Sequence, residues 1–404
     1  MSTMINNKNR REVVLAYSGG LDTTYCLVKL SRKGYKVHAV SINTGAFTDE
    51  DIEQLNSKAL LCGAKSFTCI DVREKYYEKT LKYLLFGNVL KNQVYPLSVS
   101  SERLVQAMAI AEHANELGID AIAHGSTGAG NDQVRFDLVF KMMIKNVNII
   151  TPIRDLKLSR EEEIAFLESH GISLDFKKAK YSINKGLWGT SIGGVETLKS
   201  LGTIPESAWP TQVTTQESQN MVIQFEKGEP VALNGTYFDS KAELIEAITL
   251  LAGPFGIGRD VHVGDTVIGI KGRVAFEAPA AMILIKAHHL LEKHVLSKQQ
   301  LYWKDQLSNW YGNQLHDGMV FDPVMRDIEK FLESSQQTVN GKVHIELHPY
   351  RFVLQGVESV HDLMQSKFGV YGESNGQWTS DEAKGFIHLM SVPFEIHRYV
   401  NEEN

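Results

Sequence analysis

One short segment combines the residue types that bind a phosphate group. Residues 16–24 read Ala-Tyr-Ser-Gly-Gly-Leu-Asp-Thr-Thr and follow a short apolar run typical of a buried strand. Consecutive glycines let several backbone N–H groups converge on one point, and the N-terminus of a following helix adds partial positive charge there. Ser18, Thr23 and Thr24 supply hydroxyl donors. Asp22 can hold a magnesium ion or orient the loop amides. The segment predicts a phosphate site; the alternative is a plain turn with Asp22 as helix N-cap.

This segment differs from the two commonest glycine-rich nucleotide motifs. It has neither the Gly-x-x-x-x-Gly-Lys-Ser/Thr pattern of Walker-type hydrolases nor the Gly-x-Gly-x-x-Gly pattern of dinucleotide-binding dehydrogenases. Both of these classes are therefore disfavoured.

A second segment has the residues to bind an amino acid. Residues 124–136 read His-Gly-Ser-Thr-Gly-Ala-Gly-Asn-Asp-Gln-Val-Arg-Phe and follow a strand-like run at 120–123. The glycines permit close backbone approach, and Asn131, Asp132 and Arg135 supply donors, an acceptor and a cation within five residues. An amino acid carries both an ammonium and a carboxylate, so it needs such a mixed set. The alternative is a capped loop whose charged side chains make only local bonds or are solvated.

A repeated pattern over the first 175 residues indicates the fold that would position both segments. Short β-branched runs alternate with amphipathic stretches, which is typical of an α/β fold with a parallel sheet. Ligands of such sheets bind at the carboxyl ends of the strands, so the two segments can share one site. Glycines stand where helices must end in a left-handed residue. The expected strands are 13–16, 36–42, 66–72, 120–123 and 147–150, and the helix-ending glycines are Gly34, Gly63, Gly118 and Gly171.

The sequence changes in character beyond residue 180. Residues 202–220 contain two prolines among Thr, Gln and Ser without any period, so we expect a domain boundary between about 180 and 220. The remaining pattern mixes strands and helices in an α+β arrangement. We expect strands at 221–225, 231–233, 261–270, 342–348 and 351–355, and helices at 242–251 and 279–311.

Composition and charge exclude several broad classes. The 404 residues are 43% hydrophobic and 22% charged, as in a folded protein of two or three domains. Forty-two Lys and Arg against 48 Asp and Glu give a net charge of −6, which disfavours a nucleic-acid partner. Three cysteines cannot form a disulfide framework in so long a chain, and no targeting or membrane-spanning run is visible. We therefore expect a cytoplasmic protein without a membrane partner.

The motifs resemble those of a known family. The first segment is similar to the Ser-Gly-Gly-x-Asp-Ser/Thr loop of PP-loop ATPases, the adenine-nucleotide α-hydrolase group, and within that group the chain resembles the argininosuccinate synthases. The family's Ala-Tyr-Ser-Gly-Gly-Leu-Asp-Thr loop stands at 16–23, and its Thr-Gly-x-Gly-Asn-Asp-Gln-Val-Arg-Phe stretch stands at 127–136. Two further motifs match at 181–192 and 256–280, while the C-terminal third matches only by pattern.

The resemblance implies a ligase of arginine biosynthesis that joins citrulline to aspartate, using ATP and Mg²⁺. The ureido oxygen of citrulline would attack the α-phosphorus, and the aspartate amine would then displace AMP from a citrullyl adenylate. The protein would act by positioning and charge neutralisation. The implied architecture is a Rossmann-like PP-loop domain (1–180), a synthetase α+β domain (181–370) and a C-terminal helical arm (371–404) that assembles a homotetramer.

The resemblance also implies roles for individual residues. The catalytic residues would be Asp22, Asp132 and Arg135. The planar guanidinium of Arg135 suits a carboxylate, which it can bind through two parallel hydrogen bonds. ATP would be bound by Ala16, Tyr17, Ser18, Gly19, Gly20, Leu21, Asp22, Thr23, Thr24 and Gly125. Aspartate would be bound by Thr127, Asn131 and Asp132, and citrulline by Tyr95, Ser100, Asn131, Arg135, Ser182, Ser191 and Phe276.

The second domain departs from the family pattern. Where the family usually contacts citrulline through a glutamate and a tyrosine, this chain has Gly264 and Phe276, so a carboxylate that would meet the α-ammonium is missing. Asp265 can replace it if the strand is shifted by one residue. Alternatively, the pocket accepts a citrulline whose amine is acylated. Two other readings stay open, a tRNA-modifying PP-loop ATPase and a non-catalytic nucleotide-binding regulator.

Overall fold

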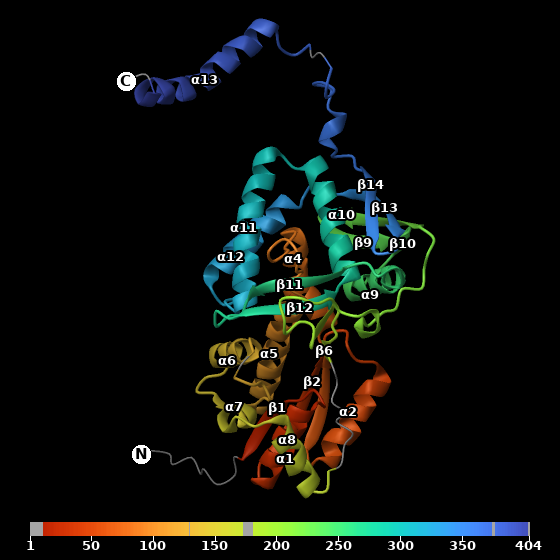
Figure 1. The fold of residues 1–404 in the computed structure, drawn as a ribbon, viewed down its shortest axis with the longest axis vertical. Helices are drawn as coiled ribbons and strands as arrows, with labels where there is room; N and C mark the ends of the chain where they lie inside the picture. The colour runs from red at the N-terminus through yellow and green to blue at the C-terminus, as the bar shows by residue number, and fades with distance from the viewer. Residues whose placement is uncertain (1–10, 129, 173–180, 374–375, 403–404) are drawn as a thin grey trace.

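A parallel five-stranded sheet forms the centre of the N-terminal half. The computed structural model describes residues 11–128, 130–172, 181–373 and 376–402 (Figure 1). The strand order is β3-β2-β1-β4-β5, and every neighbouring pair is parallel. The five strands expected from the sequence are confirmed as β1 (Glu12–Ala16), β2 (Lys36–Asn43), β3 (Ser66–Asp71), β4 (Ala121–Ala123) and β5 (Asn148–Ile150).

Helices connect these strands, and their ends follow local sequence signals. Capping boxes begin two of them, with Thr48 paired to Asp51 and Ser159 paired to Glu162. All four expected helix-ending glycines have positive φ, between 65° and 96°. The helices of this half are α1 (Leu21–Arg32), α2 (Asp49–Leu61), α3 (Arg73–Tyr76), the π-helical η1 (Tyr77–Leu81), α4 (Lys82–Phe86), α5 (Ser98–Leu117), α6 (Asp132–Met143), α7 (Pro152–Leu156) and α8 (Arg160–Ser169).

The strand order brings the two candidate segments together. The chain builds outward from β1 to β2 and β3, and then returns to add β4 on the other side of β1. Leu15 of β1 lies in register with Ala123 of β4. The segments after these two strands therefore leave the same edge of the sheet next to each other. Such a switch point, where the strand order reverses, is where open α/β sheets bind their ligands.

Two antiparallel sheets make up the second half, which confirms the α+β expectation. Their strand orders are β10-β9-β8-β13-β14 and β11-β12-β7-β6. The strands are β6 (Tyr181–Asn184), β7 (Thr190–Gly194), β8 (Gln219–Glu226), β9 (Glu229–Leu233), β10 (Thr236–Tyr237), β11 (Arg259–Asp265), β12 (Lys271–Glu277), β13 (Gly341–His348) and β14 (Arg351–Glu358). The helices are η2 (Glu206–Ala208), α9 (Lys241–Ala252), η3 (Gly253–Phe255), α10 (Pro279–Val295), α11 (Lys298–Asp317), α12 (Pro323–Ser335), η4 (Leu363–Gln365) and α13 (Ser380–Glu402).

One expectation for this half was wrong. The continuous strand expected at 261–270 is instead the end of β11 and a hairpin turn, in which Thr266 N donates to Ile270 O and Gly269 has a φ of +85°. A local turn interrupts the apolar pattern there. The helical region expected at 279–311 is confirmed as α10 and α11, and Ser297 begins α11 with a capping box to Gln300.

A segment of the N-terminal half packs among helices of the second half. Figure 1 shows α4, in orange, beside α11 and α12. The fully buried Lys304 donates to Phe86 O at 2.7 Å and forms an ion pair with the equally buried Glu292 at 2.8 Å. Asn88 and Gln336 donate to the two oxygens of the same carboxylate. This charged network ties the two halves together.

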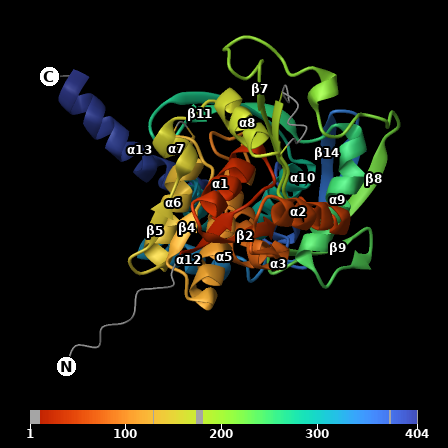
Figure 2. The same cartoon turned by 90° about the horizontal axis from the view of Figure 1, so that it is seen from below.

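The last helix stands apart from the rest of the molecule. In both views α13 projects away from the body (Figures 1 and 2), and its large apolar side chains are exposed, including Phe386, Leu389 and Phe394 at 66, 71 and 74%. Among the helices that the structure describes, none is both long and apolar enough to cross a membrane. The domain limits at 180 and 370 stay predictions; the first adjoins residues 173–180, which lie outside the described residues.

Candidate active site

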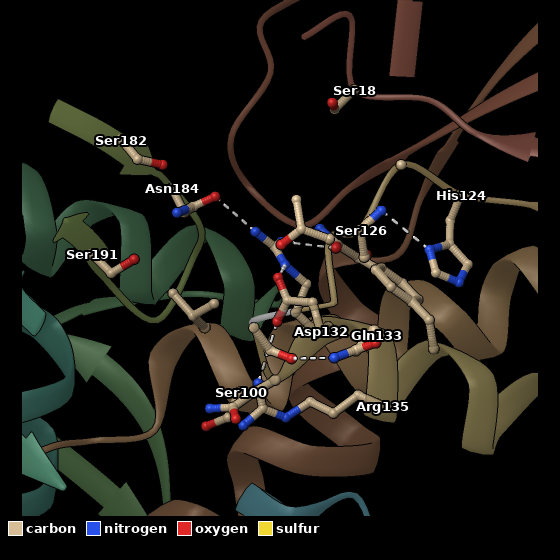
Figure 3. A pocket seen from close by; sticks show the side chains of 18 of the residues that line it. Ser18, Ser100, His124, Ser126, Asp132, Gln133, Arg135, Ser182, Asn184 and Ser191 are labelled. Atoms are coloured by element: carbon tan, nitrogen blue, oxygen red, sulfur yellow. Dashed lines mark hydrogen bonds and ion pairs between the residues drawn. The ribbon is translucent and has the colours of Figure 1, made fainter. Parts of the chain in front are cut away.

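A cavity of about 750 Å³ lies between the parallel sheet and the second half of the chain. Figure 3 shows Ser18 on the phosphate-loop side, and Ser182, Asn184 and Ser191 on strands of the second half. Most predicted site residues line it: Ala16, Tyr17, Ser18, Gly20, Leu21, Asp22, Thr23, Tyr95, Ser100, Gly125, Thr127, Asn131, Asp132, Arg135, Ser182 and Ser191. Three predicted residues are not among the described lining residues, namely Gly19, Thr24 and Phe276.

The loop after β1 has the geometry of an anion site. Gly19 has a φ of +73°, and Ser18 N donates to Thr23 Oγ1 at 3.3 Å, which closes the loop upon itself. Helix α1 begins without a capping side chain at Gly20, so the N–H groups of its first turn are available to a ligand. Lys58 adds a cation beside the loop, where its Nζ donates to Gly19 O at 2.5 Å. These features fit the phosphates of a nucleotide.

Asp22 lies in contact with both neighbouring elements. A side chain on Gly125 would come within 3.1 Å of the Asp22 Cβ and backbone, so only glycine lets the loop after β4 approach α1 this closely. On the other side Glu163 of α8 is 3% exposed, and burial together with the charge of Asp22 raises the pKa of Glu163 to about 8. Glu163 therefore holds a proton at neutral pH.

Two guanidinium groups hold Asp132 at the start of α6. Arg103 Nε lies 3.1 Å from one carboxylate oxygen of Asp132, and Arg135 Nη1 lies 3.3 Å from the other. Arg103 also donates to Asn184 Oδ1 at 2.8 Å, which links α5 to β6 of the second half. Asn131 is fixed in the same way, because its Oδ1 accepts from Val267 N at 2.9 Å. The second-domain strands thus complete the site.

The buried Arg135 is less free than its sequence suggested. Its Nε and Nη2 both donate to the carbonyl of His316, at 3.0 and 2.8 Å. The Nε/Nη2 edge is one of the two edges of a guanidinium that can bind a carboxylate through two parallel bonds, and Nη1 on the other edge is bonded to Asp132. A ligand carboxylate can therefore meet only the remaining Nη hydrogens.

Tyr95 belongs to an aromatic wall of the cavity. Its ring packs on His262 with centroids 5.2 Å apart and on Phe276 at 5.4 Å, and its hydroxyl accepts from Val99 N at 3.1 Å. Phe276 is fully buried behind this wall and supports Tyr95. Ser100 donates its hydroxyl to Leu97 O at 3.3 Å.

Sequence reasoning missed four residues of the site, which are Arg103, Glu163, Asn184 and His262. One signal was available: Arg103 follows Ser100 by three positions on the expected helix, so both face the same side. Asn184 and His262 lie within the motifs at 181–192 and 256–280, but nothing in those motifs marked these two side chains as part of the site. Glu163 lies outside all four motifs, and no spacing along the chain relates it to them.

Comparison with known proteins identifies the family. The model of the "Arginosuccinate synthase N-terminal HUP domain" matches residues 12–173, and that of the "Arginosuccinate synthase C-terminal domain" matches residues 181–397. The chain belongs to the argininosuccinate synthase family. Argininosuccinate synthase of Xanthomonas campestris pv. campestris is 36% identical over 97% of this chain and 99% of its own length. That of Methanocaldococcus jannaschii is 38% identical over 83% of this chain and 86% of its own length.

Family membership confirms the resemblance predicted from the four motifs. It makes the chain an ATP-dependent ligase of arginine biosynthesis with a PP-loop nucleotide domain. Both halves match this one family, so the alternative hypothesis of a tRNA-modifying ATPase is no longer supported.

Proposed function

We propose that this ligase joins citrulline to aspartate through a citrullyl adenylate. One observation carries the proposal: the phosphate loop after β1 and the polar loop after β4 meet in one cavity, with Gly125 against Asp22. The ureido oxygen of citrulline bonds to the α-phosphorus of ATP while the bond to pyrophosphate breaks. The aspartate amine then bonds to the ureido carbon, loses a proton and releases AMP, which carries away the ureido oxygen.

We assign the residues the roles that the family resemblance implies, and the position of most of them in one cavity supports this assignment. The loop Ala16–Thr24 and Gly125 bind ATP, and the first-turn amides of α1 hold its phosphates. Thr127, Asn131 and Asp132 bind aspartate. Tyr95, Ser100, Asn131, Arg135, Ser182 and Ser191 bind citrulline, with Phe276 acting from behind Tyr95. Asp22, Asp132 and Arg135 are the groups nearest the charges that change in the reaction.

Mg²⁺ accompanies the ATP in this proposal. Among the described residues no group of three or more His, Cys, Asp or Glu side chains could hold a metal ion. A single carboxylate beside a phosphate site, here Asp22, is instead the donor set that suits Mg²⁺ carried by nucleotide phosphates. The ion would neutralise part of the triphosphate charge.

The products of a single reaction mixture test the proposed function. Pyrophosphate release should require ATP, aspartate and a citrulline, free or N-acylated, together, and ¹⁸O placed in the ureido group should appear in AMP. ADP and orthophosphate as products, or AMP without the label, would contradict the proposal. A chain that binds ATP but releases no pyrophosphate with any citrulline derivative is the non-catalytic regulator.

The exposed face of α13 supports a homotetramer that assembles through the arm 371–404. Exposed apolar side chains in such number mark a surface that another chain covers. We expect a chain ending at residue 370 to sediment as a smaller species than the full chain. An unchanged number of protomers in the sedimenting particle would contradict the arm's role.

A cytoplasmic location is supported by the three cysteines, all of which are free.

A further inference from the structure

The orientation of citrulline follows from the proposed function, on which this inference rests. The ureido oxygen must reach the α-phosphorus, so that end of the molecule faces the phosphate loop. The α-carbon lies at the other end of a three-methylene chain. It therefore points away from the phosphate loop, and we place it against the part of the cavity that the second half contributes, which His262 and Gly264 of β11 line.

An α-ammonium group at that wall would need an unoccupied acceptor. Three carboxylates line the described part of the cavity, on Asp22, Asp132 and Asp265. Asp22 lies at the phosphate loop and is hydrogen-bonded with Glu163. Asp132 lies between two guanidinium groups and is assigned to the other substrate, aspartate. Only Asp265 belongs to the wall in question.

Asp265 lines the cavity but is solvent-exposed and already paired with a lysine. Side chains alternate along β11, so His262 and Gly264 are buried while Val263 and Asp265 are exposed. Asp265 pairs in register with Lys271 of β12, and their side chains form an ion pair at 2.6 Å. The one-residue shift that would let Asp265 replace a carboxylate at position 264 is therefore absent.

An imidazole occupies the place where a side chain at position 264 would project. A Cβ added to Gly264 would collide with Nε2 of His262, so glycine is required while the histidine holds this position. His262 is 7% exposed, and among the described residues neither of its ring nitrogens has a hydrogen-bond partner. Burial lowers the pKa of His262 and the charge of Lys91 lowers it further, so the ring is neutral at pH 7. A neutral imidazole with no hydrogen-bond partner among the described residues thus lines the cavity, and it can donate through whichever ring nitrogen carries its proton.

We propose that the site takes a citrulline whose α-amine is carried as an amide, and that His262 donates a hydrogen bond to the acyl carbonyl. An amide nitrogen has no charge, so it needs no carboxylate, and its carbonyl supplies the acceptor that His262 lacks. The ureido end is unchanged, and so is the adenylation chemistry. The product is the N-acylated argininosuccinate, and amide hydrolysis is the class of reaction that must follow to free its amine.

Steady-state pyrophosphate release with separate substrates tests this inference. With ATP and aspartate fixed, kcat/KM for N-acetylcitrulline or N-succinylcitrulline should exceed that for citrulline by about 100-fold or more. Preference between the neutral acetyl and the charged succinyl form identifies the acyl group. Turnover of citrulline with the acylated forms unused overturns the inference and leaves the proposed function intact. No pyrophosphate with any of the three overturns the proposed function as well.

Variants on β11 test the role of His262. H262A should lower kcat/KM for the preferred acylated substrate by about tenfold. The double variant H262A/G264E, which places a carboxylate in the space that the imidazole leaves, should shift preference toward free citrulline. V263A, on the exposed face of the same strand, should change neither kcat/KM for the acylated substrate nor the preference between acylated and free citrulline. Calorimetry measures whether each variant has lost affinity for the acylated substrate. The thermal unfolding midpoint of the same variant shows whether it is still folded. An unchanged preference in folded H262A overturns the role of His262.

Discussion

Replacement of Gly19 by alanine is expected to lower kcat/KM for ATP by about 100-fold. Gly19 has a φ of +73°, where an L side chain is strained by about 1–2 kcal/mol, and a Cβ there would collide with Leu55 Cδ2. Leu55 can give way, but the backbone strain remains, and we expect it to shift the loop amides away from the phosphates. Initial-rate measurements over a range of ATP concentrations, at saturating amino acids, measure the effect.

A matched control for backbone strain is Gly118→Ala. Gly118 also has a positive φ, of 65°, but it ends α5 away from the cavity, and nothing lies within 4 Å of its added Cβ. This variant should lose about 1 kcal/mol of stability and keep the wild-type KM for ATP. If G19A stays within threefold of wild type, the phosphate loop does not bind ATP as proposed.

Replacement of Lys304 by methionine is expected to lower the free energy of unfolding by about 3–5 kcal/mol. Lys304 and Glu292 are both fully buried, so removal of the ammonium leaves a carboxylate charge without its counterion. The carbonyl of Phe86 also loses its donor. Denaturant unfolding at fixed protein concentration measures the loss, since assembly makes apparent stability concentration-dependent.

Two further variants make this prediction specific to the buried charge. Lys330 forms an ion pair of the same length with Glu333, but its side chain is 79% exposed, so K330M should change stability by less than about 1 kcal/mol. K304M/E292Q, which removes the orphaned charge, should recover part of the loss. Equal effects of K304M and K330M would contradict the assigned role of the buried network.

The sequence was sufficient wherever the signal was local. The strands, the capping box at Ser159 and the left-handed glycines such as Gly34 and Gly118 are set by neighbours within a few residues. The phosphate loop is of this kind too, because glycine geometry and a helix N-terminus adjoin in the chain. The one wrong element, the strand expected at 261–270, arose where apolar residues continued through the turn between β11 and β12.

Other features of the site depend on contacts between distant segments. Arg103 of the first half donates a hydrogen bond to Asn184 of the second half. This bond can form only when the two halves are packed together. The hydrogen bonds of Arg135 to His316 span 181 residues, and they occupy an edge that the motif alone suggested was free.

By itself, the sequence determined the family, the parallel nucleotide-binding sheet and the residue types of the two loops, because these are written in short contiguous patterns. Only the tertiary structure decided that β1 and β4 are neighbours, that His262 fills the space beside Gly264 and that Lys304 is buried with Glu292. The physical reason is that burial and pairing arise from packing between segments far apart in the chain. A buried lysine or an inward-facing histidine carries no local mark that distinguishes it from an exposed one.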